Sequence, residues 1–232
     1  PVKIAALSAA QVAALTTLQV QELTSSQVGA LTAAQLGGMS PAQVVALQTQ
    51  DLVQINTVNI KGLTTAQVAN LSAGQVEALT SAQIGALEAA DFAALNVALL
   101  STAQIQAMTS AQIAALTTAQ LSSVEAEDIA VLSAATIKGL TAAQLQTLTT
   151  VQIEALSAAQ VAVLSAPQLA ALKTEQITAL QTEDVAAIST ASIAGLTTAQ
   201  AAALTDAQVL ALTTAQISRM DVVDIAALSA AD

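Results

Sequence analysis

The chain lacks the side chains on which most enzyme mechanisms depend. Its 232 residues contain no His, Cys, Trp or Tyr, and Phe92 is the only aromatic residue. Without imidazole or thiolate, it has no group that shuttles protons near neutral pH and few of the usual ligands of zinc or haem. We therefore expect no enzymatic activity, no catalytic residues, no cofactor-binding residues and no metal-binding residues.

Basic residues are also scarce. Five Lys and Arg are set against 16 Asp and Glu, which gives a formal net charge of −11. The electrostatic field of this negative charge repels nucleic acid and anionic membrane surfaces, so nucleic-acid binding is not expected. Apolar residues make up 54% of the chain, but Ser, Thr or Gln interrupts them before any run reaches the ~18–20 residues of a membrane span. We expect a folded chain without membrane insertion.

The chain begins Pro1-Val2-Lys3, without an initiator Met or an apolar signal region. This start favours a segment of a longer protein. Neighbouring segments of the same parent chain are therefore among its expected partners.

An eight-residue repeat occupies nearly the whole sequence. The consensus octad is Leu-Thr-x-Ala-Gln-Val-x-Ala, numbered here from position 1 to position 8, and the first complete octad starts at Leu7. There are 27 complete octads, a short repeat Leu95–Leu99 and five trailing residues Leu228–Asp232. No residues remain for a second kind of domain, so residues 1–232 are predicted to form a single repeat array.

A period of eight excludes one continuous helix. Eight residues at 100° each leave successive octads about 80° apart around a helix, so the apolar positions do not share a face. A β-solenoid is also disfavoured, because Ala and Gln are poor strand formers and the octad does not alternate strictly. Short helices, one in each octad, remain.

Each octad carries the signal of a helix start. Position 2 is usually Ser or Thr and position 5 is usually Gln, as in Thr141-Ala142-Ala143-Gln144. This is the capping box, in which the hydroxyl accepts from the N3 amide and the Gln side chain reaches back to the N-cap amide. Pro41 and Pro167 then fall at helix positions N1 and N2, where proline is tolerated.

The apolar positions predict how these helices pack. Position 1 is always aliphatic, and position 6 is Val, Ile, Leu or Phe in every octad except at Ala201. The two sites lie three residues apart on one helix face, so we expect them to form the core. Such short helices are unstable alone. The sequence predicts an all-α fold, an α-solenoid or superhelix of very short helices joined by tight turns and stabilised as an array.

Five octads, here called the Asp octads, replace the position-5 Gln with Asp. The aspartates are Asp51, Asp91, Asp128, Asp184 and Asp224, and Gln, Glu or Asp stands at position 2 of the same octads. Most intervals between them correspond to five octads. The octad that follows often ends in Gly, as at Gly62, Gly139 and Gly195, and the short repeat Leu95–Leu99 also follows an Asp octad. We hypothesise a superhelical turn or module of about five octads.

The Asp octads are the only candidate sites. The pairs Glu127-Asp128 and Glu183-Asp184 suggest catalytic carboxylates or calcium ligands. A structural role is favoured, because acidic residues in the first turn of a helix cap free amides and meet the helix dipole favourably. No calcium-loop motif accompanies them.

Tracts such as Leu116-Thr117-Thr118-Ala119-Gln120-Leu121 resemble the Ala/Thr/Gln-rich octapeptide tracts of large bacterial surface or secreted, adhesin-like repeat proteins. The resemblance implies an extracellular or cell-surface location and a structural or adhesive role, and it supplies no functional residues. We expect a non-enzymatic spacer, stalk or adhesive segment. One alternative is a solenoid scaffold that binds a protein, peptide or cell-surface partner along its concave surface. A lesser alternative is an ice-binding array of Thr and Ser hydroxyls.

Overall fold

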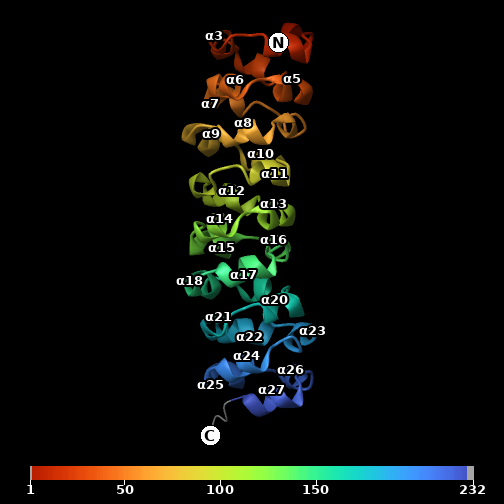
Figure 1. Cartoon of the computed structure of the whole chain (residues 1–232), viewed down its shortest axis with the longest axis vertical. Coiled ribbons are helices and arrows are strands. Elements are labelled where there is room, and N and C mark those ends of the chain that lie inside the picture. The colour runs from red at the N-terminus through yellow and green to blue at the C-terminus, as the bar shows by residue number, and fades with distance from the viewer. Residues whose placement is uncertain (1, 229–232) are drawn as a thin grey trace. The chain divides into compact units, whose positions relative to one another are not determined.

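The computed structural model describes residues 2–228, and within that range it is all-helical, with no strand. Of the trailing residues Leu228–Asp232, those from 229 onward lie outside the described residues. The chain divides into two compact units, residues 1–108 and 109–232, and the octad pattern continues through both. The predicted fold of very short helices, one per octad, is confirmed (Figure 1).

The first unit contains α1 (Val2–Ala5), α2 (Ala9–Ala13), α3 (Thr17–Gln21), α4 (Ser25–Val28), α5 (Ala33–Gly38), α6 (Pro41–Ala46), α7 (Thr49–Leu52), the 3-10 helix η1 (Ile60–Gly62), α8 (Thr65–Ala69), α9 (Ala73–Ala78), α10 (Ser81–Ala86), α11 (Ala89–Phe92), the 3-10 helix η2 (Val97–Leu99) and α12 (Thr102–Gln106).

The second unit contains α13 (Ser110–Ala115), α14 (Thr118–Ser122), α15 (Ala126–Val131), α16 (Ala134–Ile137), α17 (Ala142–Thr147), α18 (Thr150–Glu154), α19 (Ala158–Val161), α20 (Ala166–Ala170), α21 (Thr174–Ala179), α22 (Thr182–Ala187), α23 (Thr190–Ile193), α24 (Thr198–Ala203), α25 (Asp206–Ala211), α26 (Thr214–Ile217) and α27 (Val222–Ala227).

The helices begin as the capping boxes predict. At α17, the Gln144 amide donates to Thr141 Oγ1 at 3.2 Å, and the Thr141 amide donates to Gln144 Oε1 at 2.8 Å. In every described octad with Ser or Thr at position 2 and Gln at position 5, the Gln oxygen accepts from the N-cap amide, and the hydroxyl accepts from the N3 amide in all of them except those of Ser157 and Ser165. Pro41 and Pro167 lie in the first turns of α6 and α20, as predicted.

The turns between helices use extended backbone rather than glycine. After α17, Leu148 adopts φ −61° and ψ 136°, and Thr149 adopts φ −70° and ψ 160°. Two consecutive residues in the β region redirect the chain between helices. No residue from 2 to 228 has a positive φ, so these turns need none of the left-handed glycines that commonly end helices. This backbone geometry allows an array with only eight glycines.

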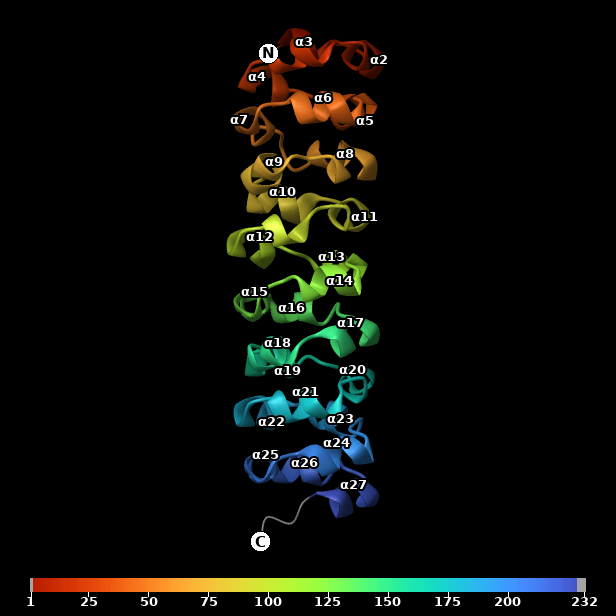
Figure 2. The same cartoon turned by 60° about the vertical axis from the view of Figure 1, so that its left-hand side comes forward.

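Within each unit, three octads complete one coil of the solenoid. Each helix packs against the helix three octads before it, as in α2 with α5 and α3 with α6 in the first unit and α13 with α16 and α24 with α27 in the second. The helices thus lie in successive layers within each unit (Figure 2). The hypothesis of a superhelical turn of five octads is therefore wrong, whereas a five-octad module remains a prediction.

Positions 1 and 6 form the core, as predicted. In the second unit, Ile113 and Ile153 at position 6 are fully buried, and Leu116 and Leu148 at position 1 are each 4% exposed. Ala201, the one position-6 residue that is not Val, Ile, Leu or Phe, is also fully buried. Each coil therefore stabilises its neighbours by burying aliphatic side chains between layers.

The position-5 glutamines connect the layers. While Gln144 Oε1 caps its own helix, its Nε2 donates to the main-chain oxygens of Ile113 and Leu116, both at 2.8 Å. These acceptors lie 31 and 28 residues earlier, at a turn of the preceding coil. The same pair of acceptor positions is used by Gln35, Gln43, Gln67, Gln75, Gln83, Gln152, Gln160, Gln176, Gln200, Gln208 and Gln216.

The short repeat Leu95–Leu99 keeps this connection. Gln104 lies after it and donates to the oxygens of Val76 and Leu79 at 2.9 and 2.7 Å. These acceptors occupy octad positions 6 and 1, as for the other glutamines, although they are only 28 and 25 residues earlier. The 3-10 helix η2 packs on α9 and replaces a full α-helix. The coil therefore closes with three fewer residues without losing register.

Candidate functional site

The five aspartates of the Asp octads all stand in the first turn of a helix, at N3. Four of them are buried and Asp128 is half-buried. A buried carboxylate must receive hydrogen bonds, since leaving it unpaired costs several kcal/mol. The partners of these carboxylates therefore define what the Asp octads do.

Hydroxyl groups of the preceding coil supply three of these hydrogen bonds. Ser25 Oγ donates to Asp51 Oδ1 at 2.5 Å, and Thr65 Oγ1 donates to Asp91 Oδ1 at 2.6 Å. Thr198 Oγ1 donates to Asp224 Oδ1 at 2.7 Å. Each hydroxyl stands at position 3 of the octad three before the Asp octad. The aspartates therefore connect coils, as the glutamines do, but they accept the hydrogen bond instead of donating it.

Asp184 receives no such hydroxyl hydrogen bond, because Ala158 occupies the equivalent position 3 in the preceding coil. Its Oδ2 instead accepts from the amide of Gln181, its own N-cap residue, at 3.1 Å. Burial raises the pKa of the Asp184 carboxyl, the Gln181 hydrogen bond opposes this, and the neighbouring Glu183 raises it further. The pKa of the exposed Glu183 is lowered, first by a hydrogen bond from its own main chain and then by the Thr182 hydroxyl.

Glutamine at position 2 accompanies aspartate at position 5 in two Asp octads, and the structure gives the reason. Gln48 Nε2 donates to the main-chain oxygen of Gln21 at 3.0 Å, and Gln181 Nε2 donates to that of Glu154 at 3.0 Å. Both acceptors lie 27 residues earlier, in the preceding coil. In these two octads, the amide donor to the preceding coil stands at position 2, and the aspartate at position 5 is an acceptor.

The octad after an Asp octad lies closer to the preceding coil than a Gln octad does. Ser192 replaces the longer Gln at position 5 in one such octad, and its Oγ reaches the oxygen of Leu164 at 2.6 Å, 28 residues earlier. At position 8 of the same octad, a Cβ on Gly195 would overlap Ala166 of the preceding coil, as one on Gly62 would overlap the main-chain oxygen of Ala33. A short donor and a glycine therefore belong to the same close approach, which explains why the sequence places them together.

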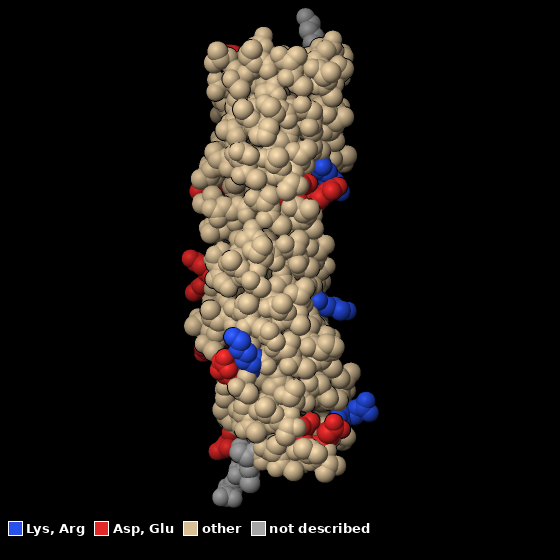
Figure 3. All heavy atoms as spheres, in the orientation of Figure 1, with Lys and Arg blue, Asp and Glu red and all other residues tan. Residues whose placement is uncertain are grey.

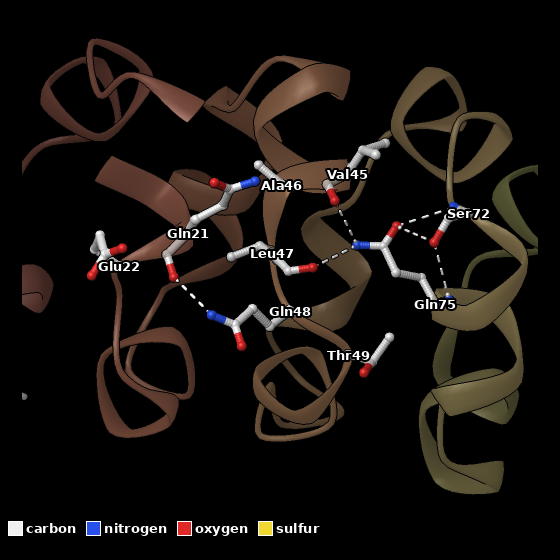
Figure 4. Close-up of a pocket in the computed structure, with 9 residues that line it drawn as sticks. All are labelled: Gln21, Glu22, Val45, Ala46, Leu47, Gln48, Thr49, Ser72 and Gln75. Atoms are coloured by element: carbon white, nitrogen blue, oxygen red, sulfur yellow. Dashed lines mark hydrogen bonds between the residues drawn. The ribbon is translucent and has the colours of Figure 1, made fainter. Parts of the chain in front are cut away.

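The Asp51 octad borders a shallow groove of about 520 Å³ in the first unit (Figure 4). Gln21, Gln48 and Gln75 are among its lining residues. Gln48 is bonded to Gln21, and Gln75 Nε2 donates to the oxygens of Val45 and Leu47 at 3.3 and 2.9 Å. The side-chain amides of Gln48 and Gln75 in the groove therefore link coils.

A smaller groove of about 300 Å³ lies in the second unit between α15 and α18. Glu127 and Glu154 line it together with alanines and Val151, which is 62% exposed. Asp128 is not among the lining residues. The groove therefore does not bring together the adjacent carboxylates of Glu127 and Asp128.

The two acidic pairs do not form a shared carboxylate site. Glu127 is exposed whereas Asp128 is half-buried, and Glu183 is exposed whereas Asp184 is buried. Each pair thus has one carboxylate in solvent and one turned toward the solenoid. Within residues 2–228, no group of three or more His, Cys, Asp or Glu residues could hold a metal ion.

The surface offers few other distinctive groups. In the face shown in Figure 3, Lys, Arg, Asp and Glu occur as small, separated groups among uncharged residues. The position-2 hydroxyls take part in the capping boxes, as in the pair of Thr141 and Gln144. No helix within the described range is both long and apolar enough to cross a membrane.

Comparison with known proteins identifies the repeat. The model of the ALTTAQ repeat family matches residues 44–81, 84–126, 153–182 and 177–214, which together cover more than half of the chain. This chain belongs to the ALTTAQ repeat family and is a structural repeat protein of the solenoid class. No curated protein sequence matches it significantly.

Proposed function

We propose that this chain is a non-enzymatic spacer or stalk segment of a larger bacterial surface or secreted protein, in which it holds adhesive or other regions apart. The observation that supports this most strongly is the repeated glutamine link. In coil after coil of each unit, the position-5 glutamine amide donates to the main-chain oxygens at octad positions 6 and 1 of the preceding coil. Adding octads therefore adds coils without requiring any new kind of contact.

The uniformity of the repeat supports this role further. An enzyme or a specific binding site needs one repeat to differ from its equivalents in reactive groups, and the differing side chains of the Asp octads at Asp51, Gln48 and Gln181 form hydrogen bonds between coils. Aromatic residues and arginine, which dominate binding hot spots, are limited to the buried Phe92 and to Arg219. A spacer needs solubility and a set length, which this composition provides.

A spacer of this kind predicts a defined length for each coil. Packed helices lie about 8–10 Å apart, so three octads add that distance along the stacking direction of a unit. We would insert two further copies of residues 148–171, which span three octads, and measure the maximum dimension by small-angle X-ray scattering. An increase of about 16–20 Å is expected for two added coils.

The control variant carries an insertion of the same composition in scrambled order. It should remain unfolded at the insertion, since it lacks the capping boxes and the core positions. If the ordered insertion leaves the maximum dimension unchanged, added coils do not set length, and the spacer proposal fails.

A further inference from the structure

The groove between α15 and α18 in the second unit combines an apolar surface with two carboxylates. Ala126 and Ala155 lie half-buried in it, and Val151 borders them with 62% of its surface exposed. Glu127 lines the groove from α15, whereas Glu154 lines it from α18. Because α15 and α18 stack in neighbouring coils, the fold places two exposed glutamates on the same groove.

Three of these lining residues depart from the repeat. Position 4 is Ala in most octads, but it is Glu at Glu127 and Val at Val151. Position 7 is Glu only at Glu77 and Glu154 among the complete octads. The octads of Glu127 and Val151 are three apart, so the coil brings these departures together. The groove therefore has side chains that the consensus octad does not provide.

The links between coils do not account for these two glutamates. Neither carboxylate forms a hydrogen bond or an ion pair with a residue in the described range. The helix dipole favours a negative charge in the first turn, as at Glu127, but Glu154 is the last residue of α18, where the dipole disfavours it. Glu154 therefore does not stabilise its own helix, and its exposed carboxylate can pair with a cation.

The octads around the groove are acidic as well. α21 packs on α18 as α18 packs on α15, and the octads of these three helices carry a single basic residue, Lys173. Their acidic residues are Glu125, Glu127, Asp128, Glu154 and Glu175. A surface of this charge attracts cationic partners. The net charge of −11 disfavours a second copy of this chain as the occupant.

We propose that the groove between α15 and α18 binds a lysine or arginine side chain of an extended basic peptide segment from a partner protein. The aliphatic stem of that side chain lies on Ala126, Ala155 and Val151, and its cationic head is held between Glu127 and Glu154. Exposed ion pairs are weak and screened by salt, so we expect a dissociation constant of about 1 mM that rises with added salt. The inference goes beyond the proposed spacer role, because it gives the surface of the array a partner.

Nuclear magnetic resonance of the full chain tests the proposal. We would titrate the isotope-labelled protein with the acetylated and amidated peptide Ala-Lys-Ala-Lys-Ala, up to about 10 mM, in about 20 mM salt. Saturable shifts are expected for the main-chain amides of residues 126–130 and 151–155 that line or flank the groove. The dissociation constant should rise at least about threefold in about 300 mM salt. The absence of saturable shifts in these two segments would overturn the proposal.

Two further probes test the charge and the peptide separately. Norleucine in place of both lysines keeps the aliphatic stem but removes the ammonium group, and it should weaken binding at least about threefold. Putrescine carries the same two positive charges without a peptide chain to lie against Val151, so it should also bind at least about threefold more weakly. An equal affinity for either probe would overturn the proposal, because the groove would then recognise an apolar chain alone or any divalent organic cation.

Matched variants then locate the site. Glu154→Gln removes one of the two charges and should weaken peptide binding about twofold to fivefold, whereas Glu77→Gln, at the same position of α9 in the first unit, should leave it unchanged. Val151→Ala restores the consensus residue and should weaken binding about twofold, whereas Val58→Ala, also exposed at position 4, should not. All four side chains are exposed, and circular dichroism establishes that each variant is folded. An equal loss of affinity in Glu154→Gln and Glu77→Gln would mean that binding follows the net charge, and it would overturn the proposal.

Discussion

The Gln octads and the Asp octads both form hydrogen bonds between neighbouring coils, but the position-5 Gln donates whereas the position-5 Asp accepts. In a Gln octad, the position-5 side chain caps its own helix and donates to two main-chain oxygens of the coil below, as Gln144 does. In three of the Asp octads, the side chain at the same position accepts a hydrogen bond from a hydroxyl of the preceding coil, as Asp51 does from Ser25. Position 5 therefore faces the preceding coil in both, and the residue decides the direction of the hydrogen bond.

This reversal changes the neighbouring residues as well. In the octad where Asp51 stands in place of Gln, the Gln48 amide at position 2 donates to a main-chain oxygen of the preceding coil. In the octad that follows, η1 replaces an α-helix and Gly62 allows the close approach. An Asp octad is thus a coordinated local variation of the junction, and the substitutions that accompany it are parts of one arrangement.

The largest expected effect comes from the close approach after an Asp octad. Gly62→Ala would place a Cβ against the main-chain oxygen of Ala33, where only main-chain atoms could move. We expect it to lower the free energy of unfolding by more than about 3 kcal/mol, as overpacking against rigid backbone does in its severe cases. Urea unfolding followed by circular dichroism measures this.

Gly74→Ala is the matched control, because Gly74 lies inside α9 of a Gln octad and its nearest neighbour to an added Cβ is Thr49 Cγ2 at 3.9 Å. It should stabilise the chain by about 0.5–1 kcal/mol, the difference in helix propensity between Gly and Ala. Equal effects of the two substitutions would show that the octad after an Asp octad packs no closer to the preceding coil than a Gln octad does, which would contradict the close approach at Gly62.

The hydrogen bond to the Asp carboxylate gives an intermediate effect. Ser25→Ala removes the hydroxyl that donates to Asp51 and leaves a buried carboxylate oxygen without that partner. We expect a loss of about 1–3 kcal/mol in the free energy of unfolding. Ser26→Ala, at the adjacent exposed position, should change it by less than about 0.5 kcal/mol. A loss of the same size in both variants would contradict a specific link.

The smallest effect is expected at Asp184, whose pKa is raised by burial. The folded chain then holds the Asp184 proton more tightly than the unfolded chain does. This contribution to stability is therefore present below the ordinary pKa of 3.8 and is lost as the pH rises through the raised value. Asp184→Asn keeps an oxygen for the Gln181 amide and removes the charge, so it should be slightly more stable than the unchanged chain at neutral pH.

Urea midpoints measured from acid to neutral pH test this at Asp184. The advantage of Asp184→Asn should shrink as the pH falls below 3.8, because the carboxyl is then neutral in both folded and unfolded chains. An advantage that grows toward acid pH would mean that the charged carboxylate is stabilising, as a link between coils would be.

The helices and the core follow from local rules, which is why the sequence predicts them. Capping at Thr141 and Gln144 involves residues three apart, and the burial of positions 1 and 6 follows from helical periodicity. One further signal was present in the sequence. Glutamate caps as well as glutamine in a capping box, yet it never occupies position 5 of an octad, and this preference indicates a required amide donor.

The number of octads per coil does not follow from such rules. It depends on the turn made by extended residues such as Leu148 and Thr149, and the sequence pattern repeats identically whatever that turn is. The five-octad spacing of the Asp octads suggested a longer coil. Since helices three octads apart are stacked within each unit, that spacing instead places Asp51 and Asp91 on different sides of the coil. The hydroxyl partners, such as Ser25, could be assigned only once the three-octad coil was known.

The most direct test of the account is the amide of a single interior glutamine. Gln144→Glu retains the oxygen that caps α17 but places a carboxylate oxygen opposite the oxygens of Ile113 and Leu116. If these glutamines connect the coils, its urea unfolding midpoint should fall, with a loss of about 1–3 kcal/mol in the free energy of unfolding. Gln19→Glu, whose amide contacts no described residue, should unfold almost as the unchanged chain does. Equal midpoints for Gln144→Glu and Gln19→Glu would contradict the account.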